Sequence, residues 1–221
     1  LREGSAEPKP LADLARASAD VVVMQELTPE LAASLDPLKS DFPFRALDAR
    51  PYAAGVGIWS RYPIEQLSRN SEYELGMVTA SLRVPGAASA VTVLAAHVAG
   101  PWPQPIDAWR REMTALPKTL DTLANITGPG AAIVAGDLNA TADMEPFRRL
   151  LSDGFRNAAD QSGAGLVRTF PADMSVPPII GIDHILTRNG SARDVTTVRI
   201  PGSDHLGVTA TIHVPRRVNT G

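Results

Sequence analysis

The sequence predicts an α/β fold in which helices lie on the outside of two packed β-sheets. Segments with helical and strand-like periodicity alternate near both ends of the 221-residue chain. The middle of the chain contains short strand-like segments bounded by proline, glycine and asparagine, which is typical of an antiparallel sheet. The 17 glycines and 19 prolines imply many turns and argue against a helical bundle. Together these observations favour a layered sandwich.

The first elements expected are a helix, a buried strand and a second helix. Apolar residues at helical spacing from Pro10 to Ala17 indicate the first helix. The β-branched run from Val21 to Met24 is typical of a strand that is buried on both faces. Thr28 suits an N-cap and a proline follows it, so a second helix is expected from about Pro29 to Leu35.

The central region predicts a series of antiparallel strands. The run from Val78 to Val84 alternates with period two, as a strand with one solvent-exposed face does. Similar short segments precede and follow it, each ended by turn residues. The strands expected here are Phe44 to Asp48, Val56 to Ser60, Ile64 to Ser68, Val78 to Val84 and Ala90 to Val98.

The second half of the chain returns to a mixture of helices and strands. We expect a long helix from Ile106 to Ala124 that is interrupted at Pro117, and then a buried strand from Ala131 to Ala135. No change of composition marks a linker, so residues 1–221 are expected to form one domain. The last elements expected are a short helix from Glu145 to Leu151 and strands near Asp183 to Thr187, Val195 to Ile200 and Val208 to Val214.

Composition limits the chemistry that the chain can perform. It has 21 basic and 24 acidic residues, a net charge of −3, and no basic run longer than two residues. Phosphate or nucleic-acid chemistry would therefore need a bound cation to provide local positive charge. The sequence has no cysteine, which excludes zinc thiolates and cysteine nucleophiles. The longest nearly apolar run, from Ala87 to Val98, is interrupted by polar residues, so it predicts no membrane span.

Two acidic clusters follow buried strands directly. Glu26 comes after the strand that ends at Met24, and an unpaired carboxylate there would cost several kcal/mol, so it needs a cation, a donor or water. Asp137 and Asn139 follow the strand that ends at Ala135, and in an extended chain both would point to the same side. A rim salt bridge for Glu26 and ordinary turn chemistry for Asp137 and Asn139 are equally weighted alternatives.

Histidines supply the remaining polar clusters. Asp183 precedes His184 inside an apolar strand, and a buried aspartate there could orient a histidine from elsewhere in the chain. Asp204 and His205 lie in the loop before the last strand, where one side chain could bind a metal while the other handles a proton. His97 closes another strand and is a further candidate, although a lone histidine there is more often structural.

These carboxylates, one amide and several histidines form an oxygen-rich set that suits Mg²⁺ or Mn²⁺ better than zinc. Each cluster alone is weak evidence for a site, but four strand-end clusters in one chain argue against coincidence. We therefore expect a single metal-dependent site at the ends of the strands.

The motifs Gln25-Glu26, Gly136-Asp137-Leu138-Asn139, Ile182-Asp183-His184 and Ser203-Asp204-His205 resemble, in this order, the endonuclease/exonuclease/phosphatase superfamily. Its members include DNase I, AP endonucleases, sphingomyelinases and inositol polyphosphate 5-phosphatases. The resemblance covers nearly the whole chain. It implies a DNase I-like four-layer sandwich of two mixed sheets flanked by helices, and hydrolysis of a phosphoester by in-line attack of water.

The resemblance also implies roles for individual acidic and amide residues. Glu26 looks like the principal Mg²⁺ ligand, and Asp204 looks like the aspartate that supports the metal or its waters. Asp137 and Asn139 would position the attacking water and the phosphate. The expected cofactor is Mg²⁺, or Mn²⁺ in its place.

The histidines take their expected roles from the same resemblance. His205 looks like the histidine that contacts the phosphate and acts as a base or as a transition-state stabiliser, oriented by Asp183. His97 matches a position where many members place a phosphate-contacting histidine or a general acid.

The family's first strand usually carries an active-site asparagine, and the resemblance places that asparagine just upstream of Leu1. Residues 1–221 are thus expected to lack the start of the first strand. Some actinobacterial members carry this domain outside the membrane behind N-terminal helices. By that likeness, we favour an extracytoplasmic, membrane-anchored protein over a cytoplasmic one, with membrane contact through the upstream region, and we expect a monomer.

We expect a substrate that contains phosphate, and the sequence allows three interpretations of the function. A phosphomonoester, phosphodiester or diphosphate that is lipid-linked or small is slightly favoured, because the chain is acidic and has only 5% aromatic residues to stack on bases. A DNA or RNA nuclease is the alternative, and a catalytically silent binding module is the second alternative. Trp102, after His97, could form an aromatic lip for a substrate, although a turn cap over the core is slightly favoured.

Overall fold

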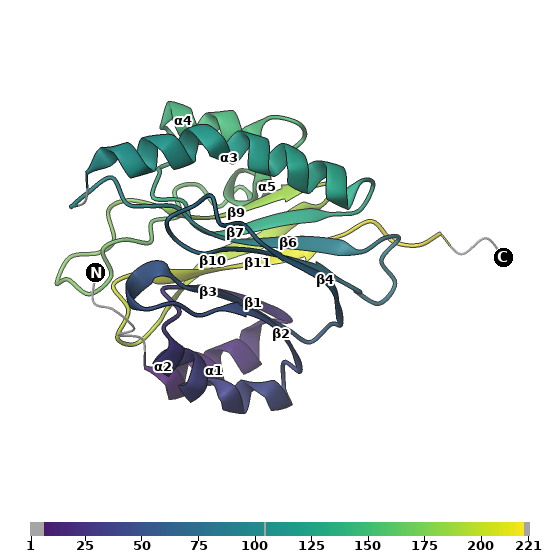
Figure 1. The fold of residues 1–221 in the computed structure, drawn as a ribbon, viewed down its shortest axis with the longest axis horizontal. Helices are drawn as coiled ribbons and strands as arrows, with labels where there is room; N and C mark the ends of the chain where they lie inside the picture. The colour runs from purple at the N-terminus through teal and green to yellow at the C-terminus, as the bar shows by residue number, and fades with distance from the viewer. Residues whose placement is uncertain (1–6, 104, 219–221) are drawn as a thin grey trace.

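The computed structural model describes residues 7–103 and 105–218, and Figure 1 shows its fold. Short 3₁₀ helices occur at Asp36–Ser40, Tyr52–Ala54 and Arg149–Leu151. The α-helices and strands are α1 (Pro8–Ser18), β1 (Val21–Gln25), α2 (Pro29–Ser34), β2 (Phe44–Asp48), β3 (Val56–Ser60), β4 (Ile64–Arg69), β5 (Met77–Leu82), β6 (Val91–His97), α3 (Ile106–Thr127), β7 (Ala132–Asp137), α4 (Glu145–Arg148), β8 (Arg156–Asn157), α5 (Ala158–Ser162), β9 (Asp183–Arg188), β10 (Ser191–Arg199) and β11 (Leu206–His213).

The strands form a large mixed sheet and two smaller antiparallel assemblies. The six-stranded sheet has the order β4-β5-β6-β7-β9-β8, and only β6 and β7 are parallel among its described pairs. The second assembly has the order β1-β3-β2, and the third is the β10-β11 pair. The predicted α/β class is thereby confirmed, and so is its antiparallel centre. The solvent-exposed face expected for the strand from Val78 to Val84 is not observed, because β5 is buried almost throughout.

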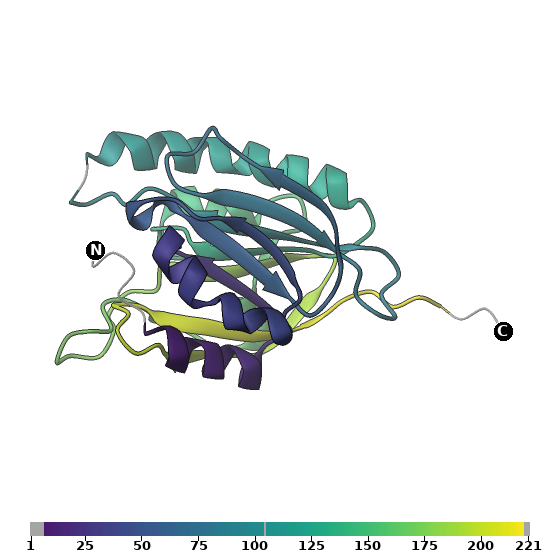
Figure 2. The ribbon, with the colours of Figure 1, turned by 60° about the horizontal axis from the view of Figure 1, so that its bottom comes forward.

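The helices lie on two opposite sides of these sheets. Helices α3 and α4 cover one side of the six-stranded sheet, while α1 and α2 lie on the far side of β1 and β3 (Figure 1). Figure 2 brings α1 and α2 forward across those strands. Three hydrophobic clusters fill the spaces between helices and sheets and between the sheets, and they centre on Leu94 and Leu116, on Ile58 and Val93, and on Leu31 and Trp59.

Local sequence signals account for most of these elements. The Oγ1 of Thr28 accepts a hydrogen bond from the amide of Leu31 at 3.1 Å and Pro29 follows it, so α2 begins where the cap predicted. The prediction that Pro117 interrupts the long helix is wrong, because α3 runs continuously through it. The face of α3 that carries Leu116 and Leu120 packs on the sheet, and this burial outweighs the hydrogen bond lost at the proline.

Gly136 allows the close pairing that places the next residue, Asp137. Its φ is 153°, and a Cβ at this position would lie 1.8 Å from the carbonyl oxygen of Ala96 on β6. Any side chain here would push β6 and β7 apart. The glycine that the sequence placed before Asp137 is therefore needed for the register between these two strands.

No helix in the described part of the chain is both long enough and apolar enough to cross a membrane.

Candidate active site

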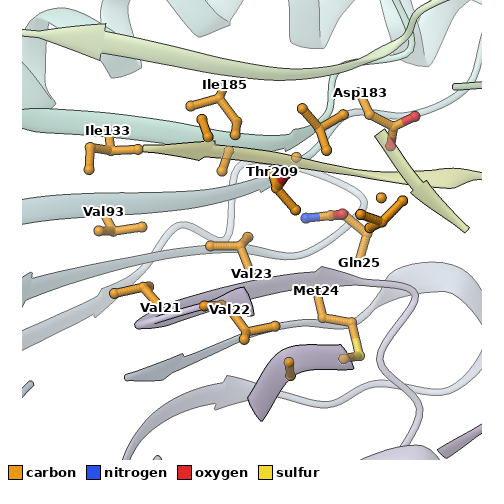
Figure 3. Close-up of a pocket in the computed structure, with 18 of the residues that line it drawn as sticks. Val21, Val22, Val23, Met24, Gln25, Val93, Ile133, Asp183, Ile185 and Thr209 are labelled. Carbon is orange, nitrogen blue, oxygen red and sulfur yellow. The ribbon is translucent and has the colours of Figure 1, made fainter. Parts of the chain in front are cut away.

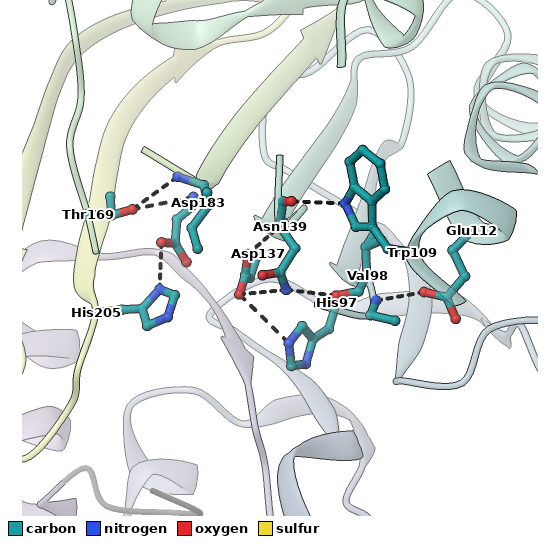
Figure 4. A network of polar contacts seen from close by, with 11 residues as sticks. His97, Val98, Trp109, Glu112, Asp137, Asn139, Thr169, Asp183 and His205 are labelled. Carbon is teal, nitrogen blue, oxygen red and sulfur yellow. Dashed lines mark hydrogen bonds and ion pairs between the residues drawn. The ribbon is translucent and has the colours of Figure 1, made fainter. Parts of the chain in front are cut away.

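Three site residues lie side by side because their strands end at the same edge of the large sheet. In the register, His97 pairs with Asp137 across β6 and β7, and Asp137 pairs with Asp183 across β7 and β9. The loop before β11 brings His205 to the same edge, as Figure 4 shows. Residues that are far apart in the sequence thus form one cluster on a rigid support.

His205 and Asp183 form the best-defined pair of the cluster. The Nδ1 of His205 lies 2.8 Å from Oδ2 of Asp183, and the ring of Phe170 packs against the imidazole. Burial lowers the pKa of His205, but the hydrogen bond to Asp183 and the charge of this carboxylate outweigh burial and raise the pKa to about 9. The expectation that Asp183 orients His205 matches this contact.

Asp137 and Asn139 form the second pair, beside His97. The amide of Asn139 donates to Oδ1 of Asp137 at 2.7 Å, and its Nδ2 donates to Oδ2 of Asp137 at 3.2 Å and to the carbonyl of Val98 at 2.9 Å. Nε2 of His97 lies 3.8 Å from Oδ2 of Asp137. Burial, followed by the charge of Asp183, raises the pKa of Asp137 well above its usual value.

His97 is itself almost completely buried. Burial lowers the pKa of its imidazole to about 4, so the ring is neutral at physiological pH. A neutral imidazole can donate or accept a hydrogen bond at the edge of the site. His184, the other histidine of the third motif, points away from the cluster, where its Nε2 lies 2.8 Å from the carbonyl of Ala140.

Glu26 approaches the cluster from the end of β1. Its backbone has a φ of 54°, in the left-handed region that glutamate rarely adopts, and Asn139 has a φ of 47°. Burial, followed by the negative charge of Asp204, raises the pKa of Glu26 to about 7. Strained backbone at two residues of one cluster, together with a perturbed carboxylate, is typical of a functional site.

The cluster fits a divalent cation. Among the described residues, Asp137, Asp183 and His205 each offer a ligand atom, and these atoms lie within 4.8 Å of one another. Glu26 and Asp204, the ligands that the sequence predicted, line the same cavity. The pKa values of Glu26 and Asp137 are raised because each carboxylate is buried and has negative neighbours, and a cation would offset both effects.

Two residues of α3 bind the backbone of loops beside the site, and the sequence analysis missed both. The carboxylate of Glu112 is buried and accepts hydrogen bonds from the amides of Glu74 and Ala99, each at 2.7 Å. Trp109 donates from Nε1 to the carbonyl of Asn139 at 2.9 Å. Figure 4 shows the side chains of Trp109 and Glu112 beside the site. In the sequence these residues read as ordinary members of an amphipathic helix.

A third residue that the sequence analysis missed is Thr169, which is completely buried. Its Oγ1 accepts from the amides of Ile182 at 3.3 Å and Asp183 at 3.4 Å. These bonds fix the start of β9 and therefore the position of the Asp183 carboxylate. The loop that carries Thr169 shows no periodic pattern that would have marked it.

The slightly favoured interpretation of Trp102 as a turn cap over the core is wrong. Its side chain is 83% exposed. The loop that carries it lies beside the site, because a Cβ on Gly100 would come within 3.5 Å of Oδ1 of Asn139 and 3.4 Å of the carbonyl oxygen of Trp102. The proline-rich loop therefore presents this indole to solvent next to the cluster.

The fold and the site define an α/β protein with an acidic and histidine cluster at the ends of its sheet strands. Residues 4–205 match the model of the Endonuclease/Exonuclease/phosphatase family, and the chain belongs to that family. The resemblance that the four motifs indicated is therefore confirmed. A comparison with curated proteins finds no match.

Solved structures of this class share the fold. The endonuclease/exonuclease/phosphatase from Bacteroides vulgatus is 16% identical, with a TM-score of 0.76 over 94% of this chain and 90% of that one. Truncated TDP2 from Caenorhabditis elegans is 15% identical, with a TM-score of 0.74 over 93% and 90%. TDP2 from D. rerio, complexed with single strand DNA product, is 16% identical, with a TM-score of 0.71 over 92% and 89%.

Proposed function

We propose that the chain is a metal-dependent phosphoesterase that hydrolyses a phosphomonoester, phosphodiester or diphosphate by in-line attack of water. This proposal rests on the placement of Asp137, Asp183 and His205 at one edge of the sheet, where their ligand atoms lie within 4.8 Å of one another. Family membership supports the same reaction class. A bound Mg²⁺ or Mn²⁺ would offset the charge of the phosphate and of the transition state.

The contacts support a separate role in the reaction for each of the chain's own residues. Asp183 fixes the His205 ring, so that the protonated imidazole can meet a phosphoryl oxygen, while its neutral form, favoured above about pH 9, could take a proton from the attacking water. Asp137 and Asn139, which bind each other, would position that water. His97 would contact the phosphate or donate a proton, acting as a neutral ring.

The proposed metal ligands are Glu26 and Asp204, as the family resemblance implies. Both carboxylates line the cavity that contains the cluster, and the charge of Asp204 acts on Glu26. Asp137 and Asp183 could share the ion with them, since their oxygens lie close by. We further propose that residues 1–221 form one domain with a four-layer sandwich.

We favour a lipid-linked or small phosphate substrate over DNA or RNA. The net charge of −3 gives little attraction for a polyanion, and the exposed Trp102 beside the site could pack against an apolar or ring-shaped group. A nuclease remains the second candidate, because a protein of the same fold was solved with a single strand DNA product. A silent binding module is disfavoured by the intact Asp183 and His205 pair.

A substrate panel tests the proposal directly. The purified protein is assayed with Mg²⁺ and with chelator on plasmid DNA, RNA, inositol phosphates, sphingomyelin and prenyl diphosphates. We expect metal-dependent release of phosphate or of a phosphate ester from the lipid-linked or small substrates. Turnover of nucleic acid alone would favour the nuclease, and no turnover on any substrate would leave the binding module.

Mg²⁺ is expected to stabilise the protein more at about pH 8 than at about pH 6, because the cation competes with protons on Glu26 and Asp137. Thermal unfolding with and without MgCl₂ measures the difference, and NaCl at equal ionic strength controls for screening. Glu26→Gln should lose most of the effect. An increase in melting temperature that is equal at both pH values would contradict a carboxylate-lined metal site.

Trp102→Ala is expected to raise KM about fivefold and to leave kcat nearly unchanged, because a solvent-exposed indole can aid binding without touching the reacting atoms. The measurement is steady-state kinetics on the best substrate of the panel. Ile126→Ala, which removes an exposed side chain near the end of α3, is the matched control. An unchanged KM in the tryptophan variant would remove this residue from the substrate-binding surface.

A further inference from the structure

The loop between α5 and β9, residues 163–182, is rich in exposed apolar side chains. Twelve large hydrophobic side chains are exposed in the described part of the chain, and five of them lie in residues 166–180. Three of the five, Met174, Val176 and Ile179, are close together in the chain and are between 53% and 66% exposed. Such a concentration on a globular domain marks a surface that meets an apolar partner.

These side chains project from a closed base. The backbones of Phe170 and Ile180 pair, because each amide donates to the carbonyl of the other residue at 3.0 Å. Pro171 and Ala172, just inside this bridge, are buried, whereas residues 173–177 are exposed. We call residues 173–179 the apolar tip. The tip extends away from the core on a base that is itself packed.

The base of the loop is bound to the active site. The ring of Phe170 packs against the imidazole of His205, with the ring centroids 4.9 Å apart. The amide of Ala172 donates to the carbonyl of Asp204 at 2.6 Å. The loop that carries the apolar tip is therefore attached to the loop that carries His205. A surface that receives the tip would lie beside the catalytic cluster.

Two exposed aromatic residues lie at the same end of the molecule. Trp102 is 83% exposed in the loop between β6 and α3, and Tyr52 is 70% exposed between β2 and β3. Figures 1 and 2 both show the β6–α3 loop and the α5–β9 loop extending from one end of the protein. Tyr52 belongs to that end, because Asp48 and Gln25 both pair with Val56. Tryptophan and tyrosine are favoured at the boundary between water and lipid.

We propose that this end of the protein docks on a lipid bilayer. The apolar tip enters the boundary between the headgroups and the acyl chains, while Trp102 and Tyr52 lie at the level of the headgroups. The active-site cluster then faces the lipid surface. The substrate class that follows, a phosphate ester embedded in a bilayer, rests on the proposed function, whereas docking itself involves no turnover.

The composition of the tip suits this environment. Asp173 is its only charged residue, and the one basic and one acidic residue of the whole loop cancel. Pro177 and Pro178 have no N–H group, so fewer backbone donors lose their water when the tip enters an apolar layer. Trp102 likewise lies between two prolines. Both loops therefore present apolar groups with few backbone donors around them.

A nucleic acid or a protein partner fits fewer of these features. The loop has no net charge to attract a phosphate backbone. The two prolines of the tip cannot donate to a neighbouring strand, which argues against pairing with the backbone of a protein partner. A projecting tip also needs a matching hollow in a folded partner, whereas acyl chains rearrange around it. Both partners are outcomes that the experiment below distinguishes.

The first measurement is sedimentation with phosphatidylcholine vesicles, in chelator so that no turnover takes part. We expect the wild type to bind and the variant Met174→Ser/Val176→Ser/Ile179→Ser to bind at least about tenfold more weakly, because three apolar side chains no longer leave water. The variant should keep the wild-type melting temperature, since these side chains are exposed. A wild type that does not bind, or a variant that binds equally well, would overturn the proposal whether or not the protein is a phosphoesterase.

The matched control removes three exposed apolar side chains elsewhere on the protein. Leu67→Ser/Ile126→Ser/Val218→Ser should bind vesicles as the wild type does. Binding should also persist in high salt, because it depends on apolar contact. Binding that requires an anionic lipid and disappears in high salt would contradict insertion of the tip. Binding of a single-stranded oligonucleotide through the tip, without binding to vesicles, would assign the loop to nucleic acid instead.

The second measurement uses the fluorescence of Trp102 to identify the docking face. The other two tryptophans are inside the fold, where Trp59 is completely buried and Trp109 is half-buried. We expect vesicles that contain brominated phosphatidylcholine to quench the wild-type emission, and Trp102→Phe to lose most of this quenching. Quenching that persists in Trp102→Phe would place another face of the protein on the bilayer and overturn the assignment.

Discussion

Replacing His205 with alanine is expected to lower kcat by about 10²–10⁴, the range over which a positioned acid–base group contributes. The imidazole is held 2.8 Å from Asp183 at the sheet edge where the carboxylates meet, and no other histidine occupies that position among the described residues. His97 cannot replace it, because that ring lies beside Asp137 and is held neutral by burial. The loss should appear in kcat more than in KM.

Two further variants make the result specific. His213→Ala removes an exposed histidine at the far end of β11, the strand that follows His205, and should retain wild-type kinetics. Asp183→Asn keeps the shape of the side chain but removes the charge that raises the pKa of His205, so the pH limit set by this histidine should move to lower pH. Wild-type turnover in His205→Ala, with unchanged circular dichroism, would refute the role.

The positions of Asp137 and Asp183 could be predicted because each lies at the boundary of a strongly patterned strand. The apolar run before Asp137 indicates β7, and the family motif indicates the start of β9. Sequence alone does not give their lateral distance, since it depends on the antiparallel register between these strands. The register is what converts two separate motifs into one cluster.

Residues that act through tertiary contacts escaped the sequence analysis for a physical reason. Glu112 accepts two backbone amides that lie 38 and 13 positions away in the chain, and no local pattern reveals such partners. Pro117 was expected to break α3 because local propensity was weighed without the burial of the helix face. The exposure of Trp102 depends on the path of its loop, which composition does not determine.

The cavity beside β1 shows a different limit of sequence reasoning. The valine run correctly predicts a strand, but the expected burial on both faces is not observed, because all five residues of β1 are only partly buried. The sequence therefore predicts that a strand forms here, but it does not predict how much of that strand is buried. The structure leaves one edge of β1 unpaired among the described strands, and no local sequence pattern reveals this.

Glu26→Gln is expected to lower turnover by orders of magnitude and, at the same time, to stabilise the metal-free protein at about pH 8. The folded-state pKa of this carboxyl is raised from 4.5 to about 7, first by burial and then by the charge of Asp204. Ionised Glu26 therefore destabilises the metal-free fold. This cost is absent below pH 4.5, grows as the pH rises, and is fully present above about pH 7.

The size of the effect follows from the same linkage. A rise of the pKa from 4.5 to about 7 corresponds to about 3 kcal/mol in the free energy of unfolding. Glutamine keeps the shape but carries no charge, so part of that amount should be recovered, raising the melting temperature by several degrees. At about pH 4 the variant and the wild type should unfold at similar temperatures.

Thermal unfolding with chelator across this pH range, together with kinetics in Mg²⁺, measures both effects on one variant. Glu72→Gln, which neutralises an exposed glutamate on another loop, should change neither stability nor turnover. Replacing a residue that serves folding alone would destabilise the protein. Replacing one that serves catalysis stabilises the protein while activity falls. A Glu26→Gln protein that is less stable at pH 8 and still active would place this carboxylate in the scaffold.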